Sequence, residues 1–153
     1  MPAYPPTPPG DDPTTHALAQ AARKLLVREG GGGKSSQEVA AGAAQAWKKM
    51  SQHLSRLVGE GGVRALFDRS LTLTCAQFPW LVSAAKAAPS DPPWNQLRTC
   101  LETQDPDVGI EASVVLVITF VRLLGKFIGE ALAVRLFHEV WPEIAPTTPK
   151  ETT

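Results

Sequence analysis

The sequence predicts an all-α protein, a compact bundle of five to six helices around a long apolar helix near the C-terminus. Apolar residues recur at helical spacing over most of the chain, and glycines or prolines separate the segments that show this pattern. The length of 153 residues and the apolar fraction of 43% suffice for one core. We therefore expect one bundle domain over residues 12–143, between a disordered proline-rich tail (1–11) and a disordered polar tail (144–153).

The first two helices are predicted from their capping residues. Asp12 is a helix cap and Pro13 suits the first helical position, so a helix begins there and runs to about Glu29, before a run of glycines. Ser35 and Glu38 have the spacing of a capping box and begin the second helix. Its apolar residues recur at helical period until Gly59, Gly61 and Gly62 interrupt them: Val39, Ala43, Trp47, Met50, Leu54, Leu57 and Val58.

Prolines divide the second half of the chain. A third helix carries apolar residues on one face over 63–78 and ends at Pro79. A short helical turn follows through residues 80–85, and a further helix runs from 92 to about 103. The last and longest helix is predicted over residues 105–141, before a final proline.

The long C-terminal helix is the most informative element. Its segment 112–121 is rich in β-branched residues, but a single strand has no partner in this sequence and the apolar pattern continues at helical period. Most of the helix circumference is apolar, so we expect this helix at the centre of the bundle. At about 100° per residue, one narrow polar stripe reaches water: Glu111, Thr119, Arg122, Lys126 and Glu130.

Three residues of this stripe, Arg122, Lys126 and Glu130, form the predicted interaction surface. Arginine is a common anchor of protein interfaces, and Lys126 and Glu130 have the spacing of an i,i+4 ion pair. The uncharged run 112–121 has ten residues, whereas a membrane span needs about twenty. We therefore expect no transmembrane span.

A repeated pattern links the two halves of the chain. RLVGEGGVRALF (56–67) is similar to KFIGEALAVRLF (126–137) at an offset of 70 residues. A duplicated two-helix unit would explain the similarity, and so would chance similarity between amphipathic helices. A duplication predicts that the helices 35–58 and 107–128, each with its successor, superpose about a pseudo-twofold axis.

Two further features bear on packing and partners. Gly125 and Gly129 have GxxxG spacing, which indicates close packing of two helices inside the bundle or, alternatively, a homodimer seam. Three tryptophans lie near breaks in the helical pattern (Trp80, Trp94 and Trp141), where they serve either as interface anchors or as core residues.

Composition narrows the possible functions. Fifteen basic and fifteen acidic residues balance, which argues against nucleic acid as the main partner. Cys75 and Cys100 have no metal-site spacing and suit a reducing, cytoplasmic compartment, and the N-terminus has no signal peptide. The three histidines lie far apart in the sequence and no catalytic set is visible. We expect no metal, no cofactor and no enzymatic activity.

Two short segments resemble functional motifs. GGGGKSS (30–36) is similar to a phosphate-binding loop, but Arg28 stands where its first glycine belongs and the preceding residues read as helix, so a linker is favoured. HLSRL, beginning at His53, loosely resembles histidine phosphotransfer domains, which are helical bundles with an exposed phosphoacceptor histidine. Leu57 stands where that family has a small glycine.

Two longer segments, VRALFDRSLTLTCAQFPWL and QDPDVGIEASVVLVITF, resemble a group of small all-helical bacterial proteins, to which no activity is attached. The leading hypothesis is a non-enzymatic protein-interaction or regulatory module of bacterial signalling that binds another protein or itself. The alternatives are a phosphotransfer protein that uses His53 and a carrier of small apolar ligands.

Overall fold

A computed structural model describes residues 13–32, 34–85 and 93–140. These residues form helices, turns and bends and no strand, so the predicted all-α bundle is confirmed. The helices are α1 (Pro13–Glu29), α2 (Ser36–Thr74), α3 (Val82–Ala85), α4 (Pro93–Glu102), α5 (Pro106–Ile128) and α6 (Glu130–Val140), with a 3-10 turn over Pro79–Leu81. The two predicted tails, the Asp12 cap and Trp141 lie outside the described residues.

The junction between α1 and α2 forms much as its capping residues predict. The Ser35 hydroxyl accepts a hydrogen bond from the backbone N–H of Glu38 at 3.1 Å. The Glu38 carboxylate accepts from the backbone N–H of Lys34 at 2.8 Å, one residue before the partner that a capping box requires. A Cβ atom on Gly42 would lie 2.4 Å from the carbonyl oxygen of Leu26, so this glycine allows α1 and α2 to pack closely.

Helix α2 consists of two arms that meet at Gly59. This glycine has φ 81° and ψ 159°, a conformation open mainly to glycine, and it separates a first arm (36–58) from a second arm (60–74). Gly61 and Gly62 remain helical, so of the three predicted interruptions only Gly59 breaks the helix. Leu57, one of the apolar residues at helical period, lies beside the break with 53% of its surface exposed.

The prediction of one helix over 105–141 is wrong. Gly129 adopts φ 98° and ψ 141°, and the chain reverses there from α5 into α6. Helix α6 packs its own apolar face, which includes Ala133 and Phe137, against the core. Apolar residues therefore recur at helical spacing on both sides of Gly129. A sequence pattern therefore shows one continuous helix where the structure has two packed arms.

The two breaks give the molecule an internal pseudo-twofold arrangement. The first arm of α2 and α5 are equally long, 23 residues, and each is followed by a positive-φ glycine and a shorter returning arm. The buried positions of the first arm match buried positions of α5 at an offset of 70 residues: 39, 40, 42, 43, 46, 47, 50 and 54. This match agrees with a duplicated two-helix unit and with similarity between amphipathic helices alike, and the superposition that a duplication predicts stays a prediction.

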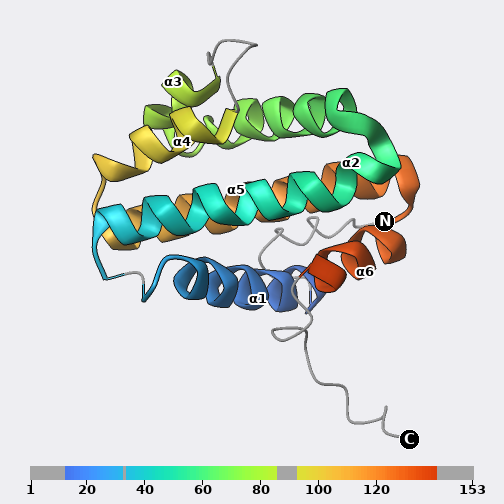
Figure 1. Ribbon diagram of the computed structural model, residues 1–153, viewed down its shortest axis with the longest axis horizontal. Coiled ribbons are helices and arrows are strands. Elements are labelled where there is room, and N and C mark those ends of the chain that lie inside the picture. The colour runs from blue at the N-terminus through green and yellow to red at the C-terminus, as the bar shows by residue number, and fades with distance from the viewer. Residues whose placement is uncertain (1–12, 33, 86–92, 141–153) are drawn as a thin grey trace, which may run out of the picture.

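The long arms lie side by side and run in the same direction (Figure 1). At one end, the Val39 side chain lies 3.0 Å from where a Cβ of its equivalent, Gly109, would stand; at the other end, Val58 and Phe127 line one pocket. The second arm of α2 lies with α3 and α4 on one side of this pair, and α6 lies with α1 on the other (Figure 1). The returning arms thus cover opposite sides of the central pair.

The core lies between these layers. Trp47 makes edge-to-face contacts with Phe67 and Phe120, with ring centroids 4.7 and 5.0 Å apart. Trp94 packs edge-to-face on Phe67, and Trp80 on Phe78, so three tryptophans of the described chain join aromatic contacts instead of standing free.

Helix α5 is the apolar centre that the sequence predicts. By length and hydropathy it is the helix of the described chain that could cross a membrane, with a mean hydropathy of 2.0 over its most apolar stretch. In the fold, 56% of that stretch is buried against other helices, and Leu116 and Phe120 are fully enclosed. Core burial therefore accounts for the hydropathy of α5, and the absence of a transmembrane span stays a prediction.

Candidate functional site

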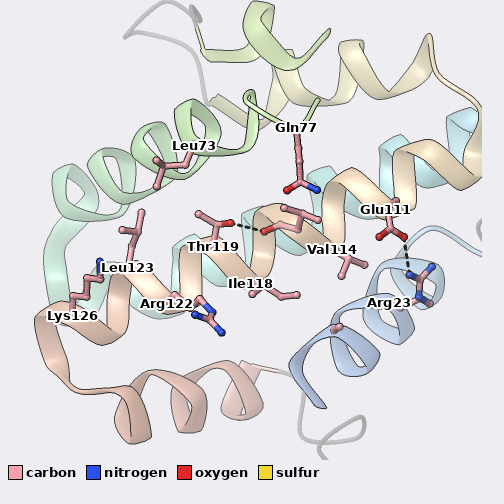
Figure 2. Close-up of a pocket in the computed structure, with 12 residues that line it drawn as sticks. Arg23, Leu73, Gln77, Glu111, Val114, Ile118, Thr119, Arg122, Leu123 and Lys126 are labelled. Carbon is pink, nitrogen blue, oxygen red and sulfur yellow. Dashed lines mark hydrogen bonds and ion pairs between the residues drawn. The ribbon is translucent and has the colours of Figure 1, made fainter. Parts of the chain in front are cut away.

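One face of α5 forms the floor of an open groove. The groove encloses about 540 Å³ and is walled by α1 on one side and by the end of the second arm of α2 on the other (Figure 2). Its floor is apolar in the middle, where Val114, Val115, Ile118 and Leu123 lie. Ala19 of α1 and Leu73 of α2 add apolar walls. The groove therefore follows one helix for several turns, between two others.

Polar side chains line the same groove. Arg23 of α1 donates to the Glu111 carboxylate of α5 at 3.1 Å, which ties the two helices together at one end (Figure 2). The Thr119 hydroxyl donates to the carbonyl oxygen of Val115 at 2.8 Å, so it is satisfied within its own helix. Toward the other end lie Arg122 and Lys126, both exposed. Three basic side chains and one acidic side chain line the groove, which makes it electropositive.

The predicted polar stripe is therefore only partly one surface. Glu111, Thr119, Arg122 and Lys126 line the groove, but Glu130 does not. Glu130 is the first residue of α6, beyond the break at Gly129, so helical spacing no longer places it with Lys126. In the described part of the chain no ion pair joins these two residues, and the predicted i,i+4 pair is wrong.

The GxxxG glycines act inside the molecule. A Cβ on Gly125 would lie 3.2 Å from the Cα of Glu130 and 3.8 Å from the Cβ of Ala133, so this glycine lets α6 return closely along α5. A Cβ on Gly129 would meet no atom within 4 Å, and that glycine serves the backbone turn instead. The internal packing role is confirmed for Gly125.

A second pocket adjoins the groove at the elbow end, where Gly59 and Gly129 break the helices. It encloses about 500 Å³ between the second arm of α2 and the last turns of α5. Its lining is almost entirely apolar except for Arg69 and Lys126 at the edge, and it shares Leu123 and Lys126 with the groove.

His53, the predicted phosphoacceptor, is only about one-third exposed. Its Nε2 atom lies 3.3 Å from a carboxylate oxygen of Glu139, across the contact between α2 and α6. Glu139 also pairs with Arg135 at 3.5 Å. These contacts give His53 a structural role in holding α6, and phosphotransfer stays an untested prediction.

The remaining candidate groups are the cysteines, His138 and the glycine-rich segment 30–36. Among the described residues, no three His, Cys, Asp or Glu side chains come close enough to hold a metal ion. Burial raises the pKa of both Cys75 and Cys100 and lowers the pKa of His138, so these groups are held neutral. GGGGKSS follows helix α1 and not a strand, as the linker reading expects.

Sequence reasoning identified the floor of the groove but missed its walls. Arg23 lies in α1, Leu73 in α2 and Gln77 in the turn after α2, and the sequence around them carries no sign of facing α5. A leucine outside the apolar face of its helix gave a weak indication that Leu73 lines a binding surface, whereas nothing in the sequence indicated this for Arg23.

No protein-family model matches the chain, and no curated protein or solved structure is significantly similar to it. The likeness to small bacterial helical proteins therefore stays a prediction.

Proposed function

We propose that this chain is a non-enzymatic interaction module that binds an acidic amphipathic helix of a partner protein in the groove on α5. The setting that we propose is regulatory, in the bacterial cytosol. The observation that carries the proposal is one groove with an apolar floor and an electropositive rim, open along a single helix.

The shape of the groove suits a helix. The lining residues of α5 extend from Glu111 to Lys126, which corresponds to about 22 Å at 1.5 Å per residue. A helix of about four turns has that length and presents apolar anchors at i, i+3 or i+4, and i+7. Ile118 lies midway along the floor and Leu73 is exposed on the wall, so both are suitable contacts for such anchors.

The charge of the groove supports an acidic partner. Arg23 pairs with Glu111 at one end of the groove, and two further basic side chains, Arg122 and Lys126, line the other end. Charges at the rim of an interface steer association and select partners more than they add affinity. A helix with carboxylates flanking its apolar face would be favoured, and nucleic acid is disfavoured by the apolar floor.

The first test is to identify what occupies the groove. A photo-cross-linking amino acid at Thr119 of the full chain is activated in the source cells, and the attached peptide is identified by mass spectrometry. We expect an acidic amphipathic segment of one protein. The corresponding synthetic peptide is then titrated against the wild type, Arg122→Glu and Leu73→Glu. Each variant is expected to bind at least about tenfold more weakly, or about 1.4 kcal/mol.

The matched control is Gln52→Glu. Gln52 is exposed on α2 at the position equivalent to Arg122, so the same carboxylate is introduced outside the groove, with a change of one charge unit where Arg122→Glu makes two. This variant should bind the peptide like the wild type. Thermal denaturation of each variant verifies its fold. The proposal fails if no adduct forms at Thr119, if the attached segment is not acidic, or if folded Arg122→Glu and Leu73→Glu bind unchanged.

A further inference from the structure

An unusually exposed aromatic side chain stands at the elbow end of the molecule. Phe127, in the last turn of α5, has 76% of its surface exposed, and its equivalent at the other elbow, Leu57, has 53%. Exposed apolar groups of this size carry a solvation cost, and where they gather they mark interaction sites. Among the described residues, Phe127 belongs neither to the buried core nor to the partly buried side chains packed against it.

An apolar hollow lies directly beside Phe127. The pocket of about 500 Å³ has Val58, Ala65, Leu66 and Leu123 in its walls, and Phe127 itself forms one edge. Gly62 contributes only its backbone to the wall, which widens the hollow next to the elbow. The volume is ample for a phenyl ring.

The exposed Phe127 ring and the apolar pocket beside it form a surface patch that is complementary to a second copy of itself. Two copies related by a twofold axis would each insert a ring into the other, because an isologous interface pairs the same patch with itself. The charges suit this occupant as well: Arg69 and Lys126 stand at the edge of the hollow, while the exposed carboxylates of Glu60 and Glu130 begin the returning arms at the same elbows.

We propose that two copies of this chain form an isologous dimer in which Phe127 of each copy inserts into the apolar pocket between α2 and α5 of the other. This interface adjoins the groove and shares Leu123 and Lys126 with it, but it does not involve the groove walls formed by α1 and the end of α2. The patch is small, so the dimer is a weak one, dissociating in the micromolar range or above, about 10⁻⁵ M.

The experiment is sedimentation equilibrium of the full chain over a range of concentrations, with variants on each side of the contact. Phe127→Ala removes the ring, and Ala65→Phe fills the hollow from an exposed position on α2. Each variant is expected to raise the dimer dissociation constant at least about tenfold. Val108→Ala, at the opposite end of α5, replaces another exposed apolar residue and should leave dimerisation unchanged.

Mixing the two variants tests the exchange itself. Phe127→Ala removes one edge of its own hollow but leaves the walls formed by Val58, Leu66 and Leu123, and Ala65→Phe keeps an intact ring, so a mixed pair restores one of the two insertions. We expect the equimolar mixture to dimerise more strongly than either variant alone, which misfolded variants would not do.

Three results would overturn the proposal. The first is a wild type that stays monomeric at the highest concentration reached. The second is a dimer that both variants leave intact, or a mixture no stronger than its components. The third is a monomeric wild type that binds an apolar dye or phospholipid vesicles through this pocket, lost in Ala65→Phe, which would assign the pocket to a small ligand or a membrane surface. The groove variants Arg122→Glu and Leu73→Glu should dimerise normally, so failure of either proposal is recognised separately.

Discussion

At the residue scale, each core residue of α5 can be compared with its counterpart in the first arm of α2, 70 residues earlier in the chain. Ser113 of α5 is buried, and its hydroxyl has no hydrogen-bond partner among the described residues. Its counterpart in the first arm of α2 is Ala43, which is fully buried with no polar atom to satisfy. A buried hydroxyl without a partner costs about 1–3 kcal/mol. Ser113 therefore carries a desolvation cost that Ala43, at the equivalent position, does not carry.

We predict that Ser113→Ala stabilises the fold. The change removes the unpartnered hydroxyl and raises helix propensity, so the free energy of unfolding in urea should rise by about 1 kcal/mol. The matched control is Ser70→Ala, also buried on a helix, whose hydroxyl donates to the carbonyl oxygen of Leu66 at 2.7 Å. The free energy of unfolding of Ser70→Ala should be at least about 1 kcal/mol lower than that of Ser113→Ala. A destabilised Ser113→Ala would mean that the hydroxyl has a partner, such as a bound water.

At the element scale, the two elbows decide how the helices are arranged. Gly59 and Gly129 hold backbone conformations that other residues adopt only with strain, and a Cβ on either would touch nothing within 4 Å. The cost of replacing them is therefore a backbone cost alone. The chain reverses at each of these glycines, and the arm that follows packs on the core. Phe67 is buried in the arm after Gly59, and Phe137 is buried in the arm after Gly129.

We predict that Gly59→Ala and Gly129→Ala each lower the free energy of unfolding by about 1–3 kcal/mol, measured by chemical denaturation. Gly61→Ala is the control: this glycine is helical, exposed and free of neighbours within 4 Å, so alanine should raise stability by about 0.5–1 kcal/mol. An equal loss in all three variants, or no loss at Gly59 and Gly129, would contradict the role of the elbows.

At the scale of the whole molecule, neighbouring helices cover most of the apolar surface of α5. Helices α1, α2 and α6 pack on it, and the face left open is the groove with its charged rim. A membrane span would have to give up this packing and carry Arg122 and Lys126 into or near the bilayer.

We predict that the chain, expressed in full, partitions into the supernatant after cell lysis without detergent. Ultracentrifugation followed by immunoblotting measures this partition. A fraction that pellets with membranes and resists an alkaline carbonate wash would contradict the prediction. A fraction released by the wash would instead indicate a peripheral contact, and Phe127→Ala would show whether the exposed elbow makes it.

The sequence by itself determined most helix boundaries and most inward faces, because these depend on local chemistry. Capping by Ser35, the prolines that begin α4 and α5, and apolar spacing act within a few residues of one another. The same local periodicity placed Arg122 and Lys126 on one polar stripe.

Only the tertiary structure decided where the long helix breaks and what the stripe faces. A glycine inside a helix costs about 1 kcal/mol relative to alanine, which burial of apolar residues on the core can outweigh. Ala133 and Phe137 would keep the same apolar spacing in a continuous helix as in a reversed one, so the sequence around Gly129 does not show which of the two forms. The groove depends on α1 and the second arm of α2 reaching α5 from far along the chain. Such contacts leave no local pattern, because they are fixed by how complete faces pack together.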